Sequence, residues 1–259
     1  MGKQHDLSSE IPKTQIVIIA GGKAKRLGLD IQKCMLEISG RRLIDICIDS
    51  LAAQGFTNIA VLAGHKSEEV VSHVSSTYGG RMHMSFSVDP PSPGGWGKGK
   101  AFKTALQGGA VDRSIRSIVV FPDDIILEEG IHLKLLSHHL MSSEKFGTNA
   151  SLVLVPEIAL DYGIAEVDKN DVVSSFREKP LVPYSASVGI YLFEPAVYEA
   201  IESSIDLRDE SPVDLESTVL PILVRRRQLS ALYIARDKWL PVNTLKEFEN
   251  AKKVLSLRQ

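Results

Sequence analysis

Apolar runs alternate with amphipathic stretches along most of this chain. Residues 16–20 form an unbroken apolar run rich in β-branched side chains, which is typical of a parallel strand buried on both faces. Residues 43–52 place apolar side chains at helical spacing, and Gly55 ends that segment. Residues 58–63 are again apolar. The chain therefore begins with a strand, a helix and a strand, the repeating unit of parallel sheets.

The same alternation continues toward the C-terminus. Further strands are predicted at 81–88, 118–121, 150–155, 186–193 and 229–235. Further helices are predicted from an N-cap at Ser67, at 101–106, at 131–141, from 194–195, at 214–227 and before Leu257. This order predicts an α/β fold, a Rossmann-like three-layer α/β/α arrangement with a mostly parallel central sheet. We expect a single domain over 14–259 after a polar tail at 1–13.

Two segments depart from the alternation. Residues 89–99 contain three prolines and four glycines, which predicts a loop fixed by special backbone angles. Residues 161–168 and 173–180 predict two strands joined by a turn at 169–171.

Composition limits the partners. Across 259 residues, 44% hydrophobic and 24% charged content is ordinary for a globular protein. The net charge of -2 argues neither for nor against nucleic acid as a bulk partner, so any phosphate chemistry must come from local clusters, and we expect no nucleic-acid partner. Cys34 and Cys47 form no disulfide framework or metal-finger spacing. With no visible signal peptide and no membrane-length apolar run, we expect a cytoplasmic protein with no membrane partner.

A glycine turn with clustered cations follows the first strand. Gly21 and Gly22 allow backbone N–H groups to approach a ligand closely. The cations near this turn are Lys23, Lys25, Arg26 and Lys33. This combination predicts a polyphosphate cradle, with a plain strand–helix connection and a solvated basic loop as the alternative. Neither the dinucleotide glycine fingerprint nor the P-loop pattern is present.

The segment AGGKAKRL at 20–27, followed by Lys33, resembles the signature of the sugar-1-phosphate nucleotidyltransferases. The resemblance implies that Arg26 clamps the leaving phosphates and that Lys33 lies near the α-phosphate, both as catalytic residues. It also implies a set of nucleotide-binding residues, namely Ala20, Gly21, Gly22, Lys23 and Lys25. Ala24, Lys25 and Gln32 stand where the family has glycine, threonine and proline.

The loop at 96–101 resembles the glycine-bearing loop that lies against the nucleotide base in this family. Gly97 and Ala101 match its pattern, and Lys98 replaces the usual threonine. The resemblance implies that Gly97 and Lys98 bind the nucleotide. A tight connection between a strand and a helix is the alternative.

Two acids follow the strand at 118–121. Asp123 and Asp124 stand where open α/β sheets place ligands, and a carboxylate there can hold Mg²⁺ between phosphate oxygens. The family has a metal-binding aspartate at the place of Asp123, after a glycine that is Pro122 here. By position, Asn243 matches the family's second metal ligand. The alternative is an asparagine N-cap for the last helix.

The segments 161–168 and 173–180 resemble the part of the family that cups the sugar phosphate. Gly163, Glu178 and Lys179 fall on its binding positions, and Ser187 stands where a sugar-contacting asparagine is usual. A plain hairpin with an exposed Glu-Lys pair is the alternative.

Together these motifs imply transfer of a nucleotide to a sugar 1-phosphate, with release of pyrophosphate. The family's reaction is a Mg²⁺-dependent in-line attack on the α-phosphate of a nucleoside triphosphate. Cytidylyl or guanylyl transfer to a non-sugar phosphate stays open, as does a non-catalytic regulatory homologue that binds nucleotide or sugar phosphate. A nicotinamide dehydrogenase is disfavoured because the glycine fingerprint is missing. Base, sugar and a possible homo-oligomer are not determined by the sequence.

Overall fold

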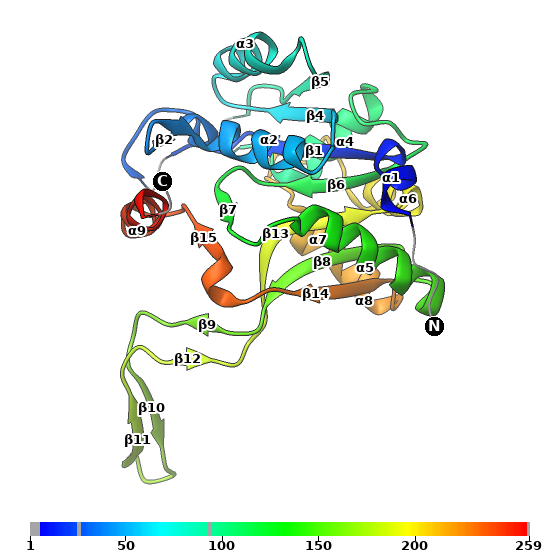
Figure 1. Ribbon diagram of the computed structural model, residues 1–259. Helices are drawn as coiled ribbons and strands as arrows, with labels where there is room; N and C mark the ends of the chain where they lie inside the picture. Colours follow the sequence, from blue (N-terminus) through cyan, green and yellow to red (C-terminus); the bar gives the residue numbers. More distant parts are fainter. Residues whose placement is uncertain (1–5, 25–26, 93–94, 258–259) are drawn as a thin grey trace.

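A seven-stranded sheet forms the middle layer of the computed structural model, which describes residues 6–24, 27–92 and 95–257 (Figure 1). The strand order is β14-β8-β13-β6-β1-β4-β5, and only β13 runs antiparallel to its neighbours. The predicted mostly parallel sheet is confirmed. The strands are β1 (Thr14–Ala20), β4 (Asn58–Ala63), β5 (His83–Val88), β6 (Arg116–Val120), β8 (Ala150–Val155), β13 (Ala186–Phe193) and β14 (Leu229–Tyr233).

Helices cover both faces of this sheet, as the three-layer prediction requires. On one face the buried core draws on α2 (Leu43–Ala53), α3 (Ser67–Tyr78) and α5 (Ile131–Phe146). On the other face it draws on α4 (Lys98–Gln107), α6 (Pro195–Ser204), α7 (Leu215–Thr218) and α8 (Leu220–Arg225). A third cluster lies beneath the last helix, α9 (Leu245–Ser256), at the edge of the sheet.

The apolar run of β1 occupies the centre because both faces of the strand are covered. All seven residues of β1 are buried. Ile16 pairs with Ile59 of β4 on one side and with Ile118 of β6 on the other, all parallel. A fully buried strand needs apolar side chains at successive positions, as observed here.

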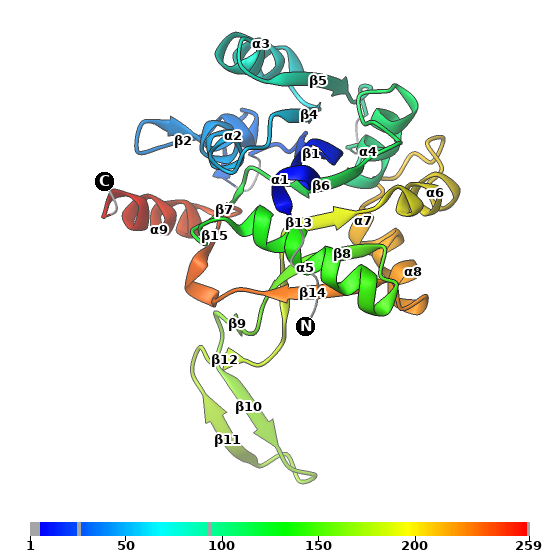
Figure 2. The ribbon, with the colours of Figure 1, turned by 45° about the vertical axis from the view of Figure 1, so that its right-hand side comes forward.

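Pairs of short strands form small sheets outside the central sheet. They are β2 (Glu37–Ile38) with β3 (Arg41–Arg42), β7 (Asp124–Ile126) with β15 (Trp239–Pro241), β9 (Ile158–Ala159) with β12 (Leu181–Val182), and β10 (Ile164–Val167) with β11 (Val173–Arg177). The β10–β11 hairpin extends away from the central sheet in both views (Figures 1 and 2). Its predicted turn is confirmed: the Asp168 carboxylate accepts the N–H groups of Asn170 and Val172.

Residues 7–13 of the predicted polar tail are helical. They form α1 (Leu7–Glu10) and a 3₁₀ turn (Ile11–Lys13), and both Leu7 and Ile11 pack on the core. The Glu10 carboxylate also accepts a hydrogen bond of 2.6 Å from Arg116 of β6. These contacts hold the segment against the sheet.

Three details of the predicted helices are wrong. The segment 214–227 forms two short helices, α7 and α8, with the break at Val219 before Pro221, which has no N–H to donate. Ser67 is the first residue of α3, and Lys66 precedes it with a φ of 49°. The N-cap of α9 is Thr244 in a capping box with Glu247. Asn243 is therefore not the cap of α9.

The remaining short elements are 3₁₀ turns at Lys33–Met35 and Arg236–Lys238. In the part of the chain that the structure describes, no helix has both the length and the apolar composition needed to cross a lipid bilayer.

Phe102→Ala is expected to lower the free energy of unfolding by about 3–5 kcal/mol, because this side chain of α4 is fully buried against β13 and α6. Its centroid lies 6.2 Å from that of Phe193 and 5.8 Å from that of Tyr198. Urea denaturation measures the change, and Phe146→Ala at a 66% exposed position is the matched control. Equal losses in the two variants would contradict this account of the core.

Candidate functional site

The carboxyl ends of three adjacent strands meet at one edge of the sheet. The register pairs Ala20 with Ala63 and Ala63 with Val88, so the next residues, Gly21, Gly64 and Asp89, lie side by side. A Cβ on Gly64 would lie 3.0 Å from the Cα and carbonyl oxygen of Gly21. Glycine is needed at this contact because a side chain would push the two turns apart.

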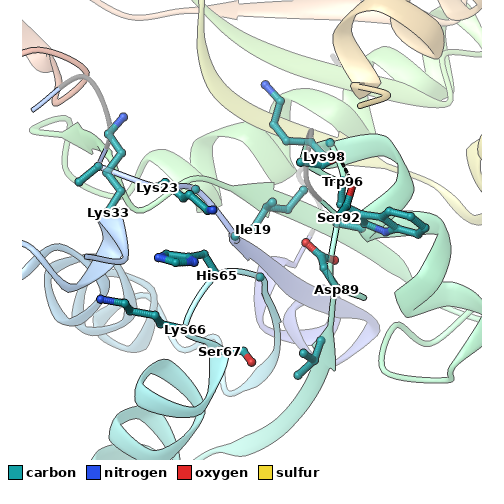
Figure 3. A pocket seen from close by; sticks show the side chains of 18 of the residues that line it. Ile19, Lys23, Lys33, His65, Lys66, Ser67, Asp89, Ser92, Trp96 and Lys98 are labelled. Carbon is teal, nitrogen blue, oxygen red and sulfur yellow. Dashed lines mark hydrogen bonds between the residues drawn. The ribbon is translucent and has the colours of Figure 1, made fainter. Parts of the chain in front are cut away.

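A cavity of about 970 Å³ opens above these strand ends (Figure 3). Its walls come from the turns after β1, β4 and β5, from the loop before α4, and from Asp123, Asp214 and Asn243. This volume lies at the upper end of the range typical of small-molecule sites.

The cavity has two chemically different ends. Figure 3 shows Lys23, Lys33, His65 and Lys66 toward one side, and Asp89, Ser92, Trp96 and Lys98 on the other. Ile19 lies between them. The first end suits phosphate groups, and the second offers an aromatic ring and the carboxylate of Asp89.

Lys33 is brought to the glycine turn by backbone pairing. Its N–H donates to the carbonyl of Gly22 at 3.0 Å, and an isolated bridge joins Lys23 to Gln32. The side chain of Lys33, 13% exposed, reaches the carboxylate of Asp123 and the amide oxygen of Asn243, the latter at 2.7 Å. The loop thus folds back to present one ammonium group beside two oxygen ligands.

Asp123 and Asn243 meet although 120 residues separate them. The pairing of β7 with β15, and a 2.8 Å bond from the N–H of Val242 to the carbonyl of Asp123, align the two segments. Both side-chain oxygens converge on the Lys33 ammonium. Carboxylate and amide oxygens fit Mg²⁺, which takes few protein ligands and completes its shell with water and phosphate. Within the described residues no group of three His, Cys, Asp or Glu side chains could hold a metal.

A smaller hollow of about 210 Å³ adjoins this point. It shares Lys33, Lys98, Asp123 and Asn243 with the large cavity. Asp124 also lines it, where burial and the neighbouring Asp123 charge raise the pKa of the Asp124 carboxyl. The shared side chains therefore stand between two adjoining spaces.

The loop before α4 is held by contacts that a side chain at Gly97 would prevent. Gly97 has a φ of 86°, and a Cβ there would lie 2.4 Å from the backbone N and O of Val213. The N–H of Lys98 donates to Asp214, and its ammonium pairs with Glu216 at 2.6 Å. The predicted loop with special backbone angles is confirmed at Gly95 and Gly97, both at positive φ.

The structure gathers most of the predicted phosphate and nucleotide residues. The large cavity is lined by Gly21, Gly22, Lys23, Lys33, Gly97, Lys98, Asp123 and Asn243, and Ala20 lines the smaller hollow. Lys25 and Arg26 lie outside the described residues. Their predicted roles stay predictions.

The predicted sugar-phosphate residues lie elsewhere. Gly163, Glu178, Lys179 and Ser187 are not among the residues that line the two hollows. Gly163 and Glu178 are close together, since a Cβ on Gly163 would lie 2.8 Å from the Glu178 carboxylate. An ion pair of 2.5 Å between Asp161 and Lys246 joins the base of their hairpin to α9. Sugar-phosphate binding by these residues stays a prediction.

The sequence analysis missed Gly64 and Asp89 as parts of the site. The available signal was position, because each residue follows directly on a strand whose carboxyl end lies at the edge where the cavity opens. Asp89 is unusual because burial raises the pKa of its carboxyl to about 7. One of its oxygens, Oδ1, is buried without a hydrogen-bond partner.

Comparison with curated proteins finds glucose-1-phosphate adenylyltransferases. The one from Cutibacterium acnes is 31% identical over 91% of this chain and 62% of its own length. That of Halalkalibacterium halodurans is 26% identical over 92% of this chain and 66% of its own length. The chain thus spans about three-fifths to two-thirds of these relatives.

Solved structures share the fold. A Bacillus anthracis structure, described as that of a candidate glucose-1-phosphate thymidylyltransferase, superposes with a TM-score of 0.68 at 18% identity, covering 93% of this chain and 94% of that one. HddC from Yersinia pseudotuberculosis, in complex with GMP-PN, gives 0.61 at 20% identity, covering 93% and 99%. These identities support the fold alone.

The profile of one family covers almost the whole molecule. It matches residues 15–256, which include every strand of the central sheet except the first residue of β1. On this match, together with the architecture above, the chain belongs to the nucleotidyl transferase family.

Proposed function

We propose that this chain joins a nucleoside triphosphate to a sugar 1-phosphate, releasing pyrophosphate and forming a nucleotide-sugar. One observation carries the proposal: Lys33, Asp123 and Asn243 converge where the large cavity meets the smaller hollow. A cation and two metal-suited oxygens at such a junction can serve phosphates that arrive from both sides. The glucose-1-phosphate adenylyltransferases among the relatives support a sugar 1-phosphate as the second substrate.

The charges of the large cavity suit a triphosphate. Lys23, Lys33 and Lys66 line it, and the glycine turn at 21–22 leaves room for backbone N–H groups to approach phosphate oxygens. Phosphate binding by Lys25 and Arg26 is proposed from the sequence alone. The nucleoside would then extend toward Asp89 and Trp96.

The reaction needs no side-chain nucleophile. An oxygen of the sugar phosphate attacks the α-phosphorus in line, and the bond from that phosphorus to the oxygen bridging to the β-phosphate breaks. Both electrons of the broken bond leave with pyrophosphate. Lys33 would turn from its carboxylate and amide partners to an α-phosphate oxygen, where its charge counters the charge of the transition state.

Asp123 and Asn243 are the residues that would hold Mg²⁺. When bound, Mg²⁺ supplies positive charge that neutralises phosphate oxygens and fixes their orientation. The two ligands are already preorganised by the β7–β15 pairing. Gly163, Glu178, Lys179 and Ser187 remain the proposed contacts of the sugar phosphate.

Lys33→Ala is expected to lower kcat/KM by about 10²–10³-fold, because a charged donor at the transition state is lost. A coupled pyrophosphate-release assay measures this, with Lys134→Ala as the control at a 53% exposed lysine of α5. Undiminished turnover in the Lys33 variant would contradict the proposed mechanism. A chain that binds substrates yet forms no product would instead be a regulatory homologue.

Asp123→Asn is expected to raise the Mg²⁺ concentration for half-maximal activity by at least about tenfold, since a neutral amide is a weaker ligand than a carboxylate. Titration of activity with Mg²⁺ measures the shift. Asp206→Asn, which alters an exposed acid paired with Arg208, is the matched control. An unchanged Mg²⁺ requirement would show that Asp123 does not hold the ion.

Glu178→Ala is expected to raise the KM for the sugar 1-phosphate by about tenfold, as hydrogen bonds from sugar hydroxyls to a carboxylate are lost. The KM for the nucleoside triphosphate should stay unchanged. Glu166→Ala on the same hairpin is the control, because Glu166 is also exposed. Equal sugar-phosphate KM values in both variants would assign the hairpin no role in sugar binding.

A further inference from the structure

Asp89 is placed by the backbone at the far end of the large cavity. Its N–H donates to the carbonyl of Ala63 at 2.8 Å, which extends the β4–β5 ladder by one residue. A Cβ on either Gly21 or Gly64 would lie 3.1 Å from Asp89 Oδ2. The carboxylate thus sits against two glycine turns that leave it space, and it lines the cavity.

The carboxylate of Asp89 lacks a partner for one oxygen. Oδ1 is closed off from solvent and accepts no hydrogen bond. Buried acceptors in native proteins are nearly always satisfied, and an orphan one is satisfied by water, an ion or a ligand. Because burial raises the pKa of Asp89, the ionised carboxylate is held at a free-energy cost until donors arrive.

The surroundings of Asp89 suit a flat aromatic ligand. Ile19, Val88 and Trp96 line the same cavity. The Trp96 ring is fixed, since its Nε1 donates to Thr104 at 3.3 Å and the Lys100 ammonium lies 4.8 Å from the ring centroid. With phosphates at the lysine end, the base of a nucleotide would reach this end (Figure 3).

We propose that Asp89 selects guanine, by accepting hydrogen bonds from guanine N1–H and the N2 amino group. These two donors are adjacent on one edge of the base and match the two oxygens of a carboxylate. Binding both donors requires the Asp89 carboxylate to rotate so that Oδ1, which is closed off from solvent without ligand, also faces the cavity. The inference rests on the proposed function for the orientation of the nucleotide in the cavity. It names Asp89 as the specificity-determining residue of that site.

The other bases present the wrong groups to an ionised carboxylate. Uracil and thymine offer one N–H flanked by two carbonyl oxygens, which repel the carboxylate. Adenine and cytosine place a ring-nitrogen acceptor beside the amino group. A site that leaves buried polar groups unpaired with the wrong ligand discriminates strongly against it.

The decisive comparison uses guanosine and inosine triphosphates, because inosine lacks only the N2 amino group. At pH 8 with Mg²⁺, the full chain is expected to bind GTP about 10–100-fold more tightly than ITP, the range for one hydrogen bond to a charged group. ATP and UTP should bind more weakly than GTP. Isothermal titration calorimetry measures each affinity without requiring turnover.

Asp89→Asn should bring the ratio of GTP to ITP affinity close to one, because the amide replaces one of the two accepting oxygens with an NH2 donor, so that adjacent N1–H and N2 donors no longer each face an acceptor. The control Asp206→Asn should keep the wild-type ratio. The inference is overturned if wild type binds ITP as tightly as GTP, if ATP or UTP binds more tightly than GTP, or if Asp89→Asn keeps the preference.

The melting temperature gives a second readout. It checks that Asp89→Asn folds and that the ionised Asp89 carboxylate lowers the stability of the unliganded protein. The pKa of Asp89 is raised to about 7 in the folded state, so the unfolded chain releases this proton at lower pH and stability falls as the pH rises from about 4 to about 7, the full cost being present above that range. Unliganded Asp89→Asn should therefore exceed wild type in Tm by more at pH 8 than at pH 5. An equal Tm difference at both pH values would contradict the claim that the ionised carboxylate destabilises the unliganded protein.

Other titratable side chains also line the cavity, but they are the same in both proteins and do not affect the comparison. They are Lys23, Lys33, His65, Lys66, Lys98, Asp123 and Asp214.

Failure of the inference and failure of the proposed function give different results. Sugar-nucleotide formation from ATP or UTP but not from GTP overturns the assignment of guanine and retains the reaction. A GTP preference that depends on Asp89, with no product from any sugar 1-phosphate, retains the assignment and overturns the reaction.

Discussion

The in-register pairing of β1 with β4 and β6 is the constraint on which the site depends. Parallel strands that share a register end at the same edge, so the residues after each strand are brought together. Gly21 and Gly64 can then touch through their backbones, with no side chain between them. A shift of one residue would exchange the two faces of the strand and separate these turns.

The two ends of the large cavity differ in the charged groups that line them. Lys33 is held between Asp123 and Asn243, so a cation and two oxygen ligands stand ready at one point. Holding these groups in place before substrate arrives would reduce the reorganisation that the proposed nucleotidyl transfer requires. At the other end one oxygen of Asp89 has no hydrogen-bond partner, and in the proposed role such a group would give selectivity among ligands rather than rate.

The wall facing this edge is rigid because buried polar contacts tie two distant loops together. The fully buried Lys100 donates to the carbonyl of Ser211 at 2.8 Å and to that of Asp209. Gly97 lies directly against Val213. A buried ammonium is stable only when its donors are satisfied, so these carbonyls and the Trp96 ring hold the loop in one position.

The sequence by itself determined the alternation of strands and helices and the α/β class, and it predicts phosphate binding by the segment at 20–33. These follow from local periodicity, glycine turns and charge, which neighbouring residues carry. The sequence could not place the helix break at Val219 or the N-cap at Thr244, because the hydrogen bonds of individual residues decide where these helices begin and end.

Only the tertiary structure decided that Asp123 and Asn243 share one lysine, that Gly64 and Asp89 belong to the site, and that the hairpin bearing Glu178 stands apart from the two hollows. Those outcomes depend on which strands pair and in what register, and pairing is set by packing between segments far apart in the chain.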